Sequence, residues 1–298
     1  MFMPSPIRVL DGVRVLSLAL NLPGPAALMR CRKMGATCVK LEPPAGDPMS
    51  HYNAAAYQQL HEGVQVIAAD LKTAAGQNVL QRELAKTDVL LTSFRPSALD
   101  KLRLGWKQLH TTYPSLSHVA IVGAAGARAE EPGHDLTYLA DNGLVPGLEL
   151  PATLYDDMSG SLMASEAVLQ AALVRNERYA GSGENHPQGV FLEVALADAA
   201  AYLALPRQWG LTRPGGAVGG AHAGYGVYPC QDGRVAVAAL EPHFAAALCK
   251  AAGVDAPDGR TMFQPATRTA VAAFLNSRTR AELQRLSVDH DIPLHCME

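Results

Sequence analysis

The chain has 298 residues, 48% of them hydrophobic and 18% charged, which is the composition of a globular protein and not of a disordered or fibrous one. Its formal net charge of −3, with no basic run, gives no electrostatic reason to expect DNA or RNA as a partner. No stretch approaches the ~18–20 apolar residues that a membrane span needs, and the first residues lack the pattern of a secretory signal.

The chain contains five cysteines, an odd number, without a CxxC pair or a tight cluster. Such spacing is typical of reduced thiols in a cytosolic protein and not of a disulfide framework. We therefore expect a cytoplasmic location. We expect neither a bound metal nor a nucleotide redox cofactor, because ligand-like spacing and a GxGxxG after the first strand are both missing.

The first two thirds of the chain alternate short β-branched runs with amphipathic helical patterns. Predicted strands cover residues 14–18, 37–41, 64–68, 89–92, 116–122 and 190–194. Predicted helices cover residues 25–34, 73–86, 158–174 and 196–205, with further helical stretches between the middle strands. This alternation predicts an α/β fold, with a Rossmann-like, mainly parallel sheet covered by helices on both faces. Ligands of such sheets bind in the loops beyond the carboxyl ends of the strands.

Two predicted helix starts carry candidate binding groups. The first helix opens through Gly24-Pro25, where free amide groups could meet a cofactor, although this is also an ordinary helix start. Asp157 stands directly before the long apolar segment 158–174. A helix N-terminus there favours the carboxylate anion, whereas burial disfavours it, so the sequence leaves the direction of its pKa shift open.

A glycine-dense stretch over residues 213–220 separates two parts of the chain. We expect residues 1–208 to form a large α/β domain, residues 209–224 a Gly-rich hinge, and residues 225–298 a small α+β domain. The small domain is predicted to begin with a hairpin of strands 226–229 and 234–238. Helical patterns follow over residues 242–250, 267–275 and 279–286.

Three short segments from distant parts of the chain carry proton-handling side chains. They are Gly133-His134-Asp135, Tyr155-Asp156-Asp157-Met158-Ser159-Gly160-Ser161 and Ala239-Leu240-Glu241-Pro242. A histidine and carboxylates brought together from such segments are what acid/base chemistry on a carbon acid requires. Taken singly, His134 reads as a loop histidine and Asp157 as a helix cap. The combination predicts a catalytic site.

Further motifs run in a consistent order from about residue 8 to the last residues. They are Leu10-Asp11-Gly12-Val13-Arg14-Val15-Leu16, Pro23-Gly24-Pro25, Met34-Gly35-Ala36, Val39-Lys40-Leu41-Glu42-Pro43-Pro44, Ala69-Asp70-Leu71-Lys72, Ser93-Phe94-Arg95-Pro96 and Leu192-Glu193-Val194-Ala195-Leu196-Ala197-Asp198-Ala199-Ala200. With these motifs the chain resembles the class III CoA-transferase family, which includes formyl-CoA and carnitine CoA-transferases and the α-methylacyl-CoA racemases.

The resemblance implies an enzyme whose substrate is a coenzyme A thioester, and two roles for Asp157. The segments around His134 and Glu241 look more like the racemase branch. There His134 and Asp157 would flank the α-carbon of an acyl-CoA, Glu241 would support the histidine from the smaller domain, and Asp135 would lie nearby. In the transferase branch Asp157 would form an acyl anhydride and pass CoA to a free carboxylic acid.

The resemblance also bears on which residues would contact coenzyme A and on the oligomeric state. Lys40, Lys72 and Arg95 would meet CoA phosphates, with Gly24-Pro25 nearby, although solvated surface charge is the ordinary reading of such cations. Family members form dimers of interlocked ring-shaped subunits, so we expect a homodimer.

The family members also continue well past the counterpart of residues 291–294 and carry an arginine-containing stretch where this chain has His61-Glu62-Gly63-Val64-Gln65. These departures keep a third reading open, a non-catalytic acyl-CoA-binding homologue.

Overall fold

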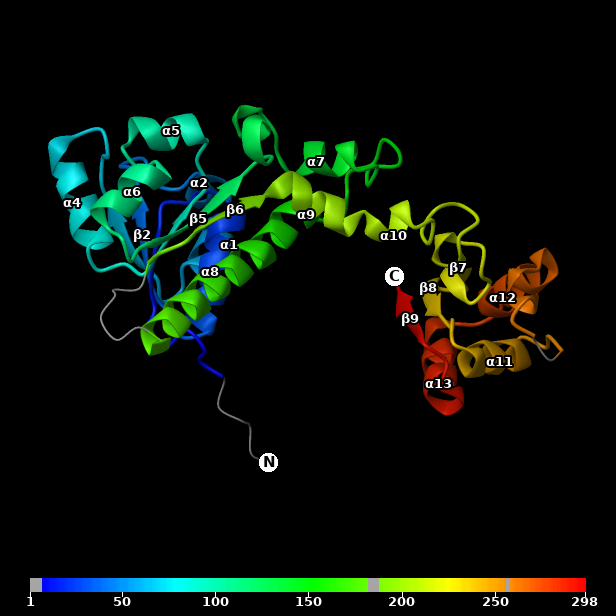
Figure 1. The fold of residues 1–298 in the computed structure, drawn as a ribbon. Coiled ribbons are helices and arrows are strands. Elements are labelled where there is room, and N and C mark those ends of the chain that lie inside the picture. Colours follow the sequence, from blue (N-terminus) through cyan, green and yellow to red (C-terminus); the bar gives the residue numbers. More distant parts are fainter. Residues whose placement is uncertain (1–6, 182–187, 256–257) are drawn as a thin grey trace. The chain divides into compact units, whose positions relative to one another are not determined.

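The computed structural model describes residues 7–181, 188–255 and 258–298, with the side chains of residues 176–181 left aside (Figure 1). Two compact units make up the chain, Met1–Ala204 and Leu205–Glu298. The residues of the predicted hinge, 209–224, contain turns and a short 3₁₀ helix, η2 (Ala217–Gly219).

The first unit is built on a six-stranded sheet in which every neighbouring pair of strands is parallel. The strands are β1 (Arg14–Ser17), β2 (Thr37–Glu42), β3 (Gln65–Ala68), β4 (Val89–Thr92), β5 (Ser117–Val122) and β6 (Phe191–Ala195). Their order across the sheet is β3-β2-β1-β4-β5-β6, the doubly wound arrangement. The predicted α/β class and parallel sheet are confirmed.

Helices follow the strands and cover the sheet in Figure 1. They are α1 (Pro23–Lys33), α2 (Met49–Tyr52), α3 (Ala54–Leu60), α4 (Ala74–Leu84), α5 (Pro96–Lys101), α6 (Trp106–Thr112), α7 (Asp135–Asp141), α8 (Tyr155–Gly181) and α9 (Leu196–Leu203), with the 3₁₀ helix η1 (Gly126–Glu130) before α7. Short helices such as α2, α3 and α7 escaped the sequence patterns because one or two turns show no clear period.

Both faces of the sheet are buried, because neighbouring residues of one strand point to opposite sides. Val15 belongs to a core that includes Leu28 of α1 and Val168 of α8. The next residue, Leu16, belongs to a second core with Leu80 of α4. The central strands therefore read as continuous apolar runs, and helices close each side.

The strand order reverses between β1 and β4, so the loops that follow these two strands diverge and leave a crevice at their carboxyl ends. Close packing in the loop after β1 explains the glycine at the start of α1. A Cβ atom on Gly24 would lie 2.1 Å from the Cβ of Ala19, so no larger residue fits there. The first turn of α1 is therefore packed tightly against the loop that follows β1.

The long helix α8 begins at Tyr155, three residues before the predicted start at Met158. Asp156 and Asp157 therefore lie inside its first turn. The apolar pattern that predicted the helix begins only at Met158, because the first turn carries the two carboxyl groups.

The second unit holds a three-stranded antiparallel sheet in the order β7-β8-β9, with helices packed on it. Its elements are α10 (Leu205–Gln208), β7 (Tyr225–Cys230), β8 (Gly233–Ala238), α11 (Pro242–Ala251), the 3₁₀ helix η3 (Thr261–Phe263), α12 (Pro265–Asn276), α13 (Arg280–His290) and β9 (Leu294–Met297). The predicted hairpin corresponds to β7 and β8. The third strand, β9, was not predicted, because its four residues show no strand alternation on their own.

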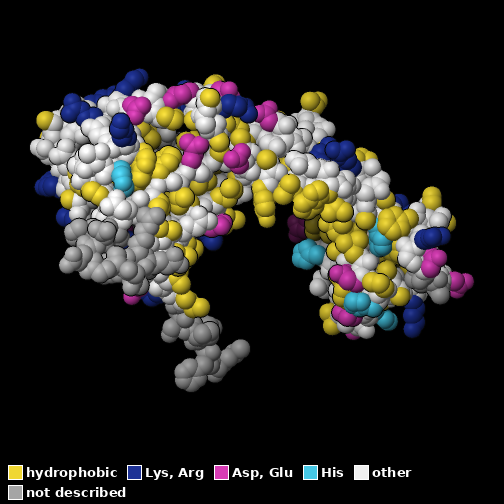
Figure 2. Space-filling view, viewed as in Figure 1, with side chains coloured by type: hydrophobic (Ala, Val, Ile, Leu, Met, Phe, Trp, Pro, Cys, Tyr) yellow, Lys and Arg dark blue, Asp and Glu magenta, His cyan; other side chains and the backbone are white. Residues whose placement is uncertain are grey.

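Charge is mixed on the surface of the first unit, where Figure 2 shows basic and acidic side chains interspersed on the visible face.

Among the described residues, no helix has the length and the apolar content that crossing a membrane would require. All five cysteines are free thiols, four of them buried.

Candidate active site

A cavity of about 480 Å³ opens at the carboxyl ends of β1, β4 and β5 in the first unit. Its wall includes Asn21 and Leu22 from the loop after β1, residues 93–95 from the loop after β4, and Val122 at the end of β5. Residues 131–134 and Asp157 of α8 line it as well. This is the position in which doubly wound sheets hold their ligands.

His134 and Asp157, which the sequence predicted as catalytic residues, both line this cavity. His134 is exposed and stands directly before α7. Its backbone amide donates to the hydroxyl of Thr137 at 3.0 Å, and the amide of Thr137 donates to the carbonyl oxygen of His134 at 2.8 Å. These bonds fix the backbone that carries the imidazole.

Asp135 ties the start of α7 to the start of α8. Its carboxylate oxygen Oδ1 accepts the backbone amides of Asp156 at 2.7 Å and of Asp157 at 3.0 Å. The side chain is only 5% exposed and is not part of the cavity wall. An acidic side chain that accepts the free amides of a helix start stabilises that start, so Asp135 holds the turn that carries Asp157.

The structure settles the direction of the pKa shift that the sequence left open. The pKa of Asp157 is raised to about 6, first by burial, then by the negative charge of Asp135, while His134 lowers it. Burial therefore outweighs the helix N-terminus, whose nearby amides are already satisfied by Asp135. A carboxyl group with such a pKa can both donate and accept a proton near neutral pH.

Asp156 is a titratable residue of the site that the sequence interpretation did not single out. Its side chain is completely buried, and neither carboxylate oxygen has a hydrogen-bond partner among the described residues. Burial and the charges of Asp157 and Asp135 raise its pKa to about 8. The backbone amide of Ala200 lowers it as a weak donor, without forming a hydrogen bond of normal geometry. The doublet of acidic residues was the available signal, but such doublets at helix starts are usually solvated.

Of the residues predicted to contact the cofactor, some line the cavity and others lie outside it. Arg95 is exposed and lines the cavity. Lys72 is exposed too, but it lies in a different depression, beside α4. Gly24 and Pro25 are buried in the first turn of α1, and their neighbour Pro23 lines the cavity in their place.

Lys40 is fully buried inside a cluster of polar side chains and does not line the cavity. Its ammonium group lies 3.0 Å from Glu42 Oε1 and 2.8 Å from His61 Nε2, and it also pairs with Asp47. His61 Nδ1 lies 2.7 Å from the carbonyl oxygen of Tyr57, so Nδ1 carries the proton and Nε2 accepts from Lys40. Lys40 thus serves the buried cluster and is not exposed to a cofactor phosphate.

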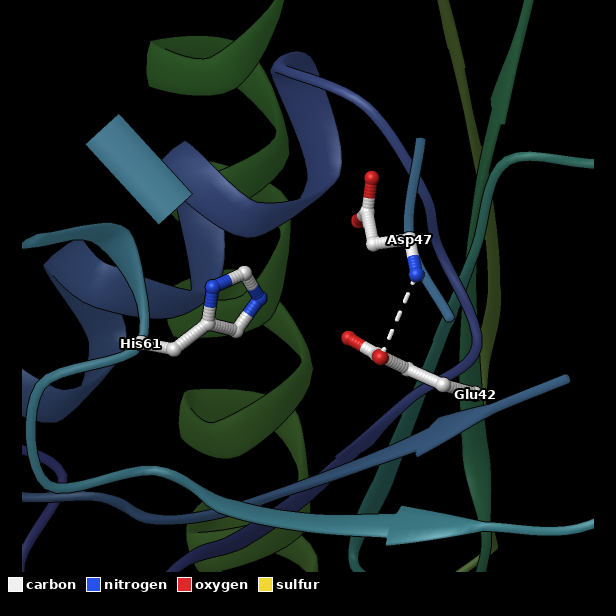
Figure 3. Close-up of side chains that lie close together, drawn as sticks. All are labelled: Glu42, Asp47 and His61. Atoms are coloured by element: carbon white, nitrogen blue, oxygen red, sulfur yellow. Dashed lines mark hydrogen bonds between the residues drawn. The ribbon is translucent and has the colours of Figure 1, made fainter. Parts of the chain in front are cut away.

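Glu42, Asp47 and His61 point toward one another in Figure 3, where the amide of Asp47 donates to Glu42 Oε2 at 3.2 Å. Their ligand atoms lie within 4.8 Å of one another, the spacing of a metal site. The Lys40 ammonium already contributes a cation to this group. The arrangement therefore satisfies the three side chains without a metal ion.

The buried cluster also supports the cavity wall. Asp47 accepts the backbone amide of Asn21 at 3.1 Å and that of Met49 at 2.9 Å, and both residues line the cavity. Asn21 has a positive φ of 64°, a conformation that costs free energy unless its surroundings hold it. The hydrogen bond from the Asn21 amide to the Asp47 carboxylate helps to hold this conformation.

Glu241 lies in the second unit, directly before α11, and is exposed. The residue precedes Pro242 at the first helical position, the usual place for proline at a helix start. Its predicted support of His134 remains a prediction.

Comparison with known proteins identifies the family. The model of CoA-transferase family III matches residues 10–297, nearly the whole chain. The α-methylacyl-CoA racemase of Mus musculus is 30% identical over 271 residues, which cover 84% of this chain and 66% of the mouse protein. The succinyl-CoA–D-citramalate CoA-transferase of Chloroflexus aurantiacus is 30% identical over 201 residues, covering 62% of this chain and 50% of that enzyme. The chain thus spans two thirds or less of the length of these relatives.

A solved structure agrees on the fold. The crystal structure of a hypothetical protein from Mycobacterium tuberculosis superimposes with a TM-score of 0.82 at 23% identity, covering 98% of this chain and 86% of that one. The family match over residues 10–297 accords with the motifs that run through the chain in the same order. The chain belongs to CoA-transferase family III.

Proposed function

We propose that the protein moves a proton at the α-carbon of a 2-methylacyl-CoA, the reaction of a racemase. One observation carries this proposal: a histidine directly before α7 and a carboxyl group in the first turn of α8 line one cavity at the ligand-binding edge of the sheet. The mouse relative that is 30% identical is an α-methylacyl-CoA racemase, which supports the same chemistry.

In the proposed reaction His134 takes the α-proton, and the electron pair of the C–H bond moves into the thioester to form an enolate. The carboxyl group of Asp157 then gives its proton to the other side of the α-carbon, which inverts the centre. The opposite enantiomer reacts in reverse, with Asp157 as base. A pKa of about 6 suits Asp157 for both directions, because neither protonation state is scarce near neutral pH.

The test is incorporation of deuterium from D₂O into the α-position of a 2-methylacyl-CoA, without any added acid. We expect exchange by the wild type and a loss of roughly 10²–10⁴-fold in His134→Ala and Asp157→Asn, the contribution typical of a proton-transferring group. The exposed residues His290 and Asp141 offer the matched controls His290→Ala and Asp141→Asn, which should exchange like the wild type. Exchange that survives both site substitutions contradicts the proposed roles.

A second candidate is CoA transfer to a free carboxylic acid, with Asp157 as the nucleophile. The Chloroflexus relative, a CoA-transferase at the same 30% identity, favours it. Here the carboxylate of Asp157 attacks the thioester and releases CoA thiolate, which leaves an anhydride. Transfer would require an acceptor acid and would leave an adduct on Asp157 that hydroxylamine traps, whereas α-proton exchange needs neither.

A non-catalytic acyl-CoA-binding protein is the third candidate, and calorimetry with acetyl-CoA separates it from the enzymes. Arg95 is the predicted phosphate contact that lines the cavity, so we expect Arg95→Ala to weaken binding by roughly tenfold, the worth of one charge-assisted bond. Lys72→Ala, whose side chain lies outside the cavity, should bind like the wild type. Tight binding by the wild type without exchange or transfer would support the non-catalytic candidate.

A further inference from the structure

The buried carboxyl group of Asp156 has no cation beside it among the described residues that would stabilise its ionised form. The side chain has 0% exposure, and within the described part of the chain neither carboxylate oxygen forms a hydrogen bond of normal geometry. The backbone amide of Ala200 is a weak donor that lowers the pKa of Asp156 less than burial raises it. The salt bridges formed among the described residues do not include Asp156. A buried carboxylate that has no well-formed hydrogen bond and no cation is costly to ionise, so such a group retains its proton.

The neighbours of Asp156 make ionisation harder still. One carboxylate oxygen from each of Asp135, Asp156 and Asp157 lies within 4.8 Å of the other two. The titratable groups that act on Asp156 are Asp157 from its own helix and Asp135 and Tyr138 from α7, while α9 presents the backbone of Ala200. All three side chains are acids, so none of them offsets a negative charge on Asp156.

Asp135 is engaged with the backbone of α8, because its Oδ1 accepts the amides of Asp156 and Asp157. Asp156 and Asp157 are the two members of the trio whose pKa values are raised. When two such groups interact strongly, their protons come off in two steps that belong to the pair and not to either residue.

We propose that Asp156 is a positioning residue that holds one proton in common with Asp157, so that the pair carries a single negative charge while the site is active. The inference rests on the proposed proton transfer, because its consequence concerns the enolate. An enolate beside a doubly charged pair would meet added repulsion, so loss of the second proton at alkaline pH should stop the reaction. With one proton in the pair, Asp157 is available as an acid and as a base.

An infrared titration of the full-length wild type tests the charge state without any turnover. With ¹³C-labelled aspartate, we expect the C=O band of a protonated, buried carboxyl group at pH 7, which disappears as the pH passes about 8. Asp156→Asn should lose this band, whereas the control Asp141→Asn, at an exposed site on α7, should keep it. Absence of the band in the wild type, or its persistence in Asp156→Asn, overturns the proposal. The three aspartates are spaced closely enough to hold a metal ion, so a band that appears only after EDTA has removed a metal also overturns it.

The pH profile of α-proton exchange tests the functional half. We expect the wild-type rate to fall roughly tenfold per pH unit above the upper step and the Asp156→Asn rate to stay level over the same range. Identical profiles of the two proteins overturn the proposal. If Asp156→Asn does not fold, Asp156→Ala replaces it, with circular dichroism as the check. A wild type that exchanges no deuterium at any pH refutes the proposed reaction, whereas the infrared titration still decides the protonation of Asp156.

Discussion

Asp135, Asp156 and Asp157 have the same side chain but three different environments. Asp135 accepts two backbone amides, Asp156 is buried without a well-formed hydrogen bond in the described part of the chain, and Asp157 lines the cavity. Burial raises the pKa of Asp157 to about 6 and that of Asp156 to about 8. The environment, and not the residue type, therefore separates a carboxylate that caps a helix start from two carboxyl groups with raised pKa values.

The stability of the protein should report the buried proton of Asp156. The pKa of this group is about 8 in the folded protein and near its ordinary value of 3.8 in the unfolded chain. Between these values the folded state binds more protons than the unfolded state, so the contribution of Asp156 to stability falls as the pH rises from about 4 to about 8 and is level above.

Asp156→Asn removes this dependence, so we expect it to be more stable than the wild type at pH 8, on the order of 3 kcal/mol after allowance for relaxation, with a smaller difference at pH 5. Thermal unfolding at a series of pH values measures it. A difference between the two proteins that does not change with pH would show that Asp156 ionises freely in the folded state.

That His134 and Asp157 lie near each other could be predicted from the sequence, because their motifs stand at fixed places in a recognisable order, and both residues line the cavity. Their catalytic roles stay predictions. The burial of Asp156 could not be predicted, since it is produced by the packing of α8 against α9, which no local pattern contains. The burial of Lys40, which was predicted to contact CoA phosphates, could not be predicted for the same reason. Lysine side chains are mostly exposed, and the partners that bury this one, Glu42, Asp47 and His61, are supplied by the fold.

At the scale of elements, the contact between the start of α7 and the start of α8 determines where the two proposed proton-transfer groups stand. His134 precedes α7 and Asp157 lies in the first turn of α8. The only side-chain hydrogen bonds between these starts, in the ranges that the structure describes, are the two that Asp135 accepts. The placement of His134 relative to Asp157 therefore depends on the Asp135 carboxylate.

Asp135→Ala should destabilise the protein by roughly 2–4 kcal/mol, because two amides of the α8 start lose a charged acceptor. Asp135→Asn keeps a carbonyl oxygen in that place and should cost less than half as much. Urea unfolding compares the two, with Asp141→Ala as the control from the exposed end of α7. Equal stability of Asp135→Ala and the wild type would show that the two hydrogen bonds do not hold this turn.

The loop after β1 depends on the buried cluster below it. Lys40→Met would leave Glu42 and Asp47 as buried carboxylates without their cation, at a cost on the order of 3–5 kcal/mol. Because Asp47 also holds the amides of Asn21 and Met49, the cavity wall should loosen as well.

Urea unfolding measures the loss of stability in Lys40→Met, and acyl-CoA affinity measures the state of the wall. Lys72→Met, at an exposed position, is the matched control and should change stability little. If Lys40→Met unfolds at the same urea concentration as the wild type, the cluster is not a support of this loop.

The sheet could be predicted at this scale, with its class and the positions of its strands, because the strands are buried on both faces and read as apolar runs. The start of α8 was placed three residues late, at Met158 and not at Tyr155, because its first turn is polar. β9 was missed, because a four-residue strand is defined by its pairing with β8 and not by its own pattern.

At the scale of the whole molecule, the chain combines a doubly wound unit, Met1–Ala204, with a smaller unit, Leu205–Glu298, that has its own sheet and core. The first unit contains both His134 and Asp157, together with the cavity that they line. Relatives in the family include a racemase and a CoA-transferase at the same identity, so the reaction has to be decided by the chemistry of this chain.

The most direct measurement starts from one pure enantiomer of a 2-methylacyl-CoA in D₂O and follows both the configuration and the isotope at the α-carbon. We expect inverted product with one deuterium at that carbon, and we expect His134→Ala and Asp157→Asn to slow both changes together by the same large factor. Retention of configuration with no deuterium, accompanied by transfer of CoA to an added carboxylic acid, would contradict this expectation.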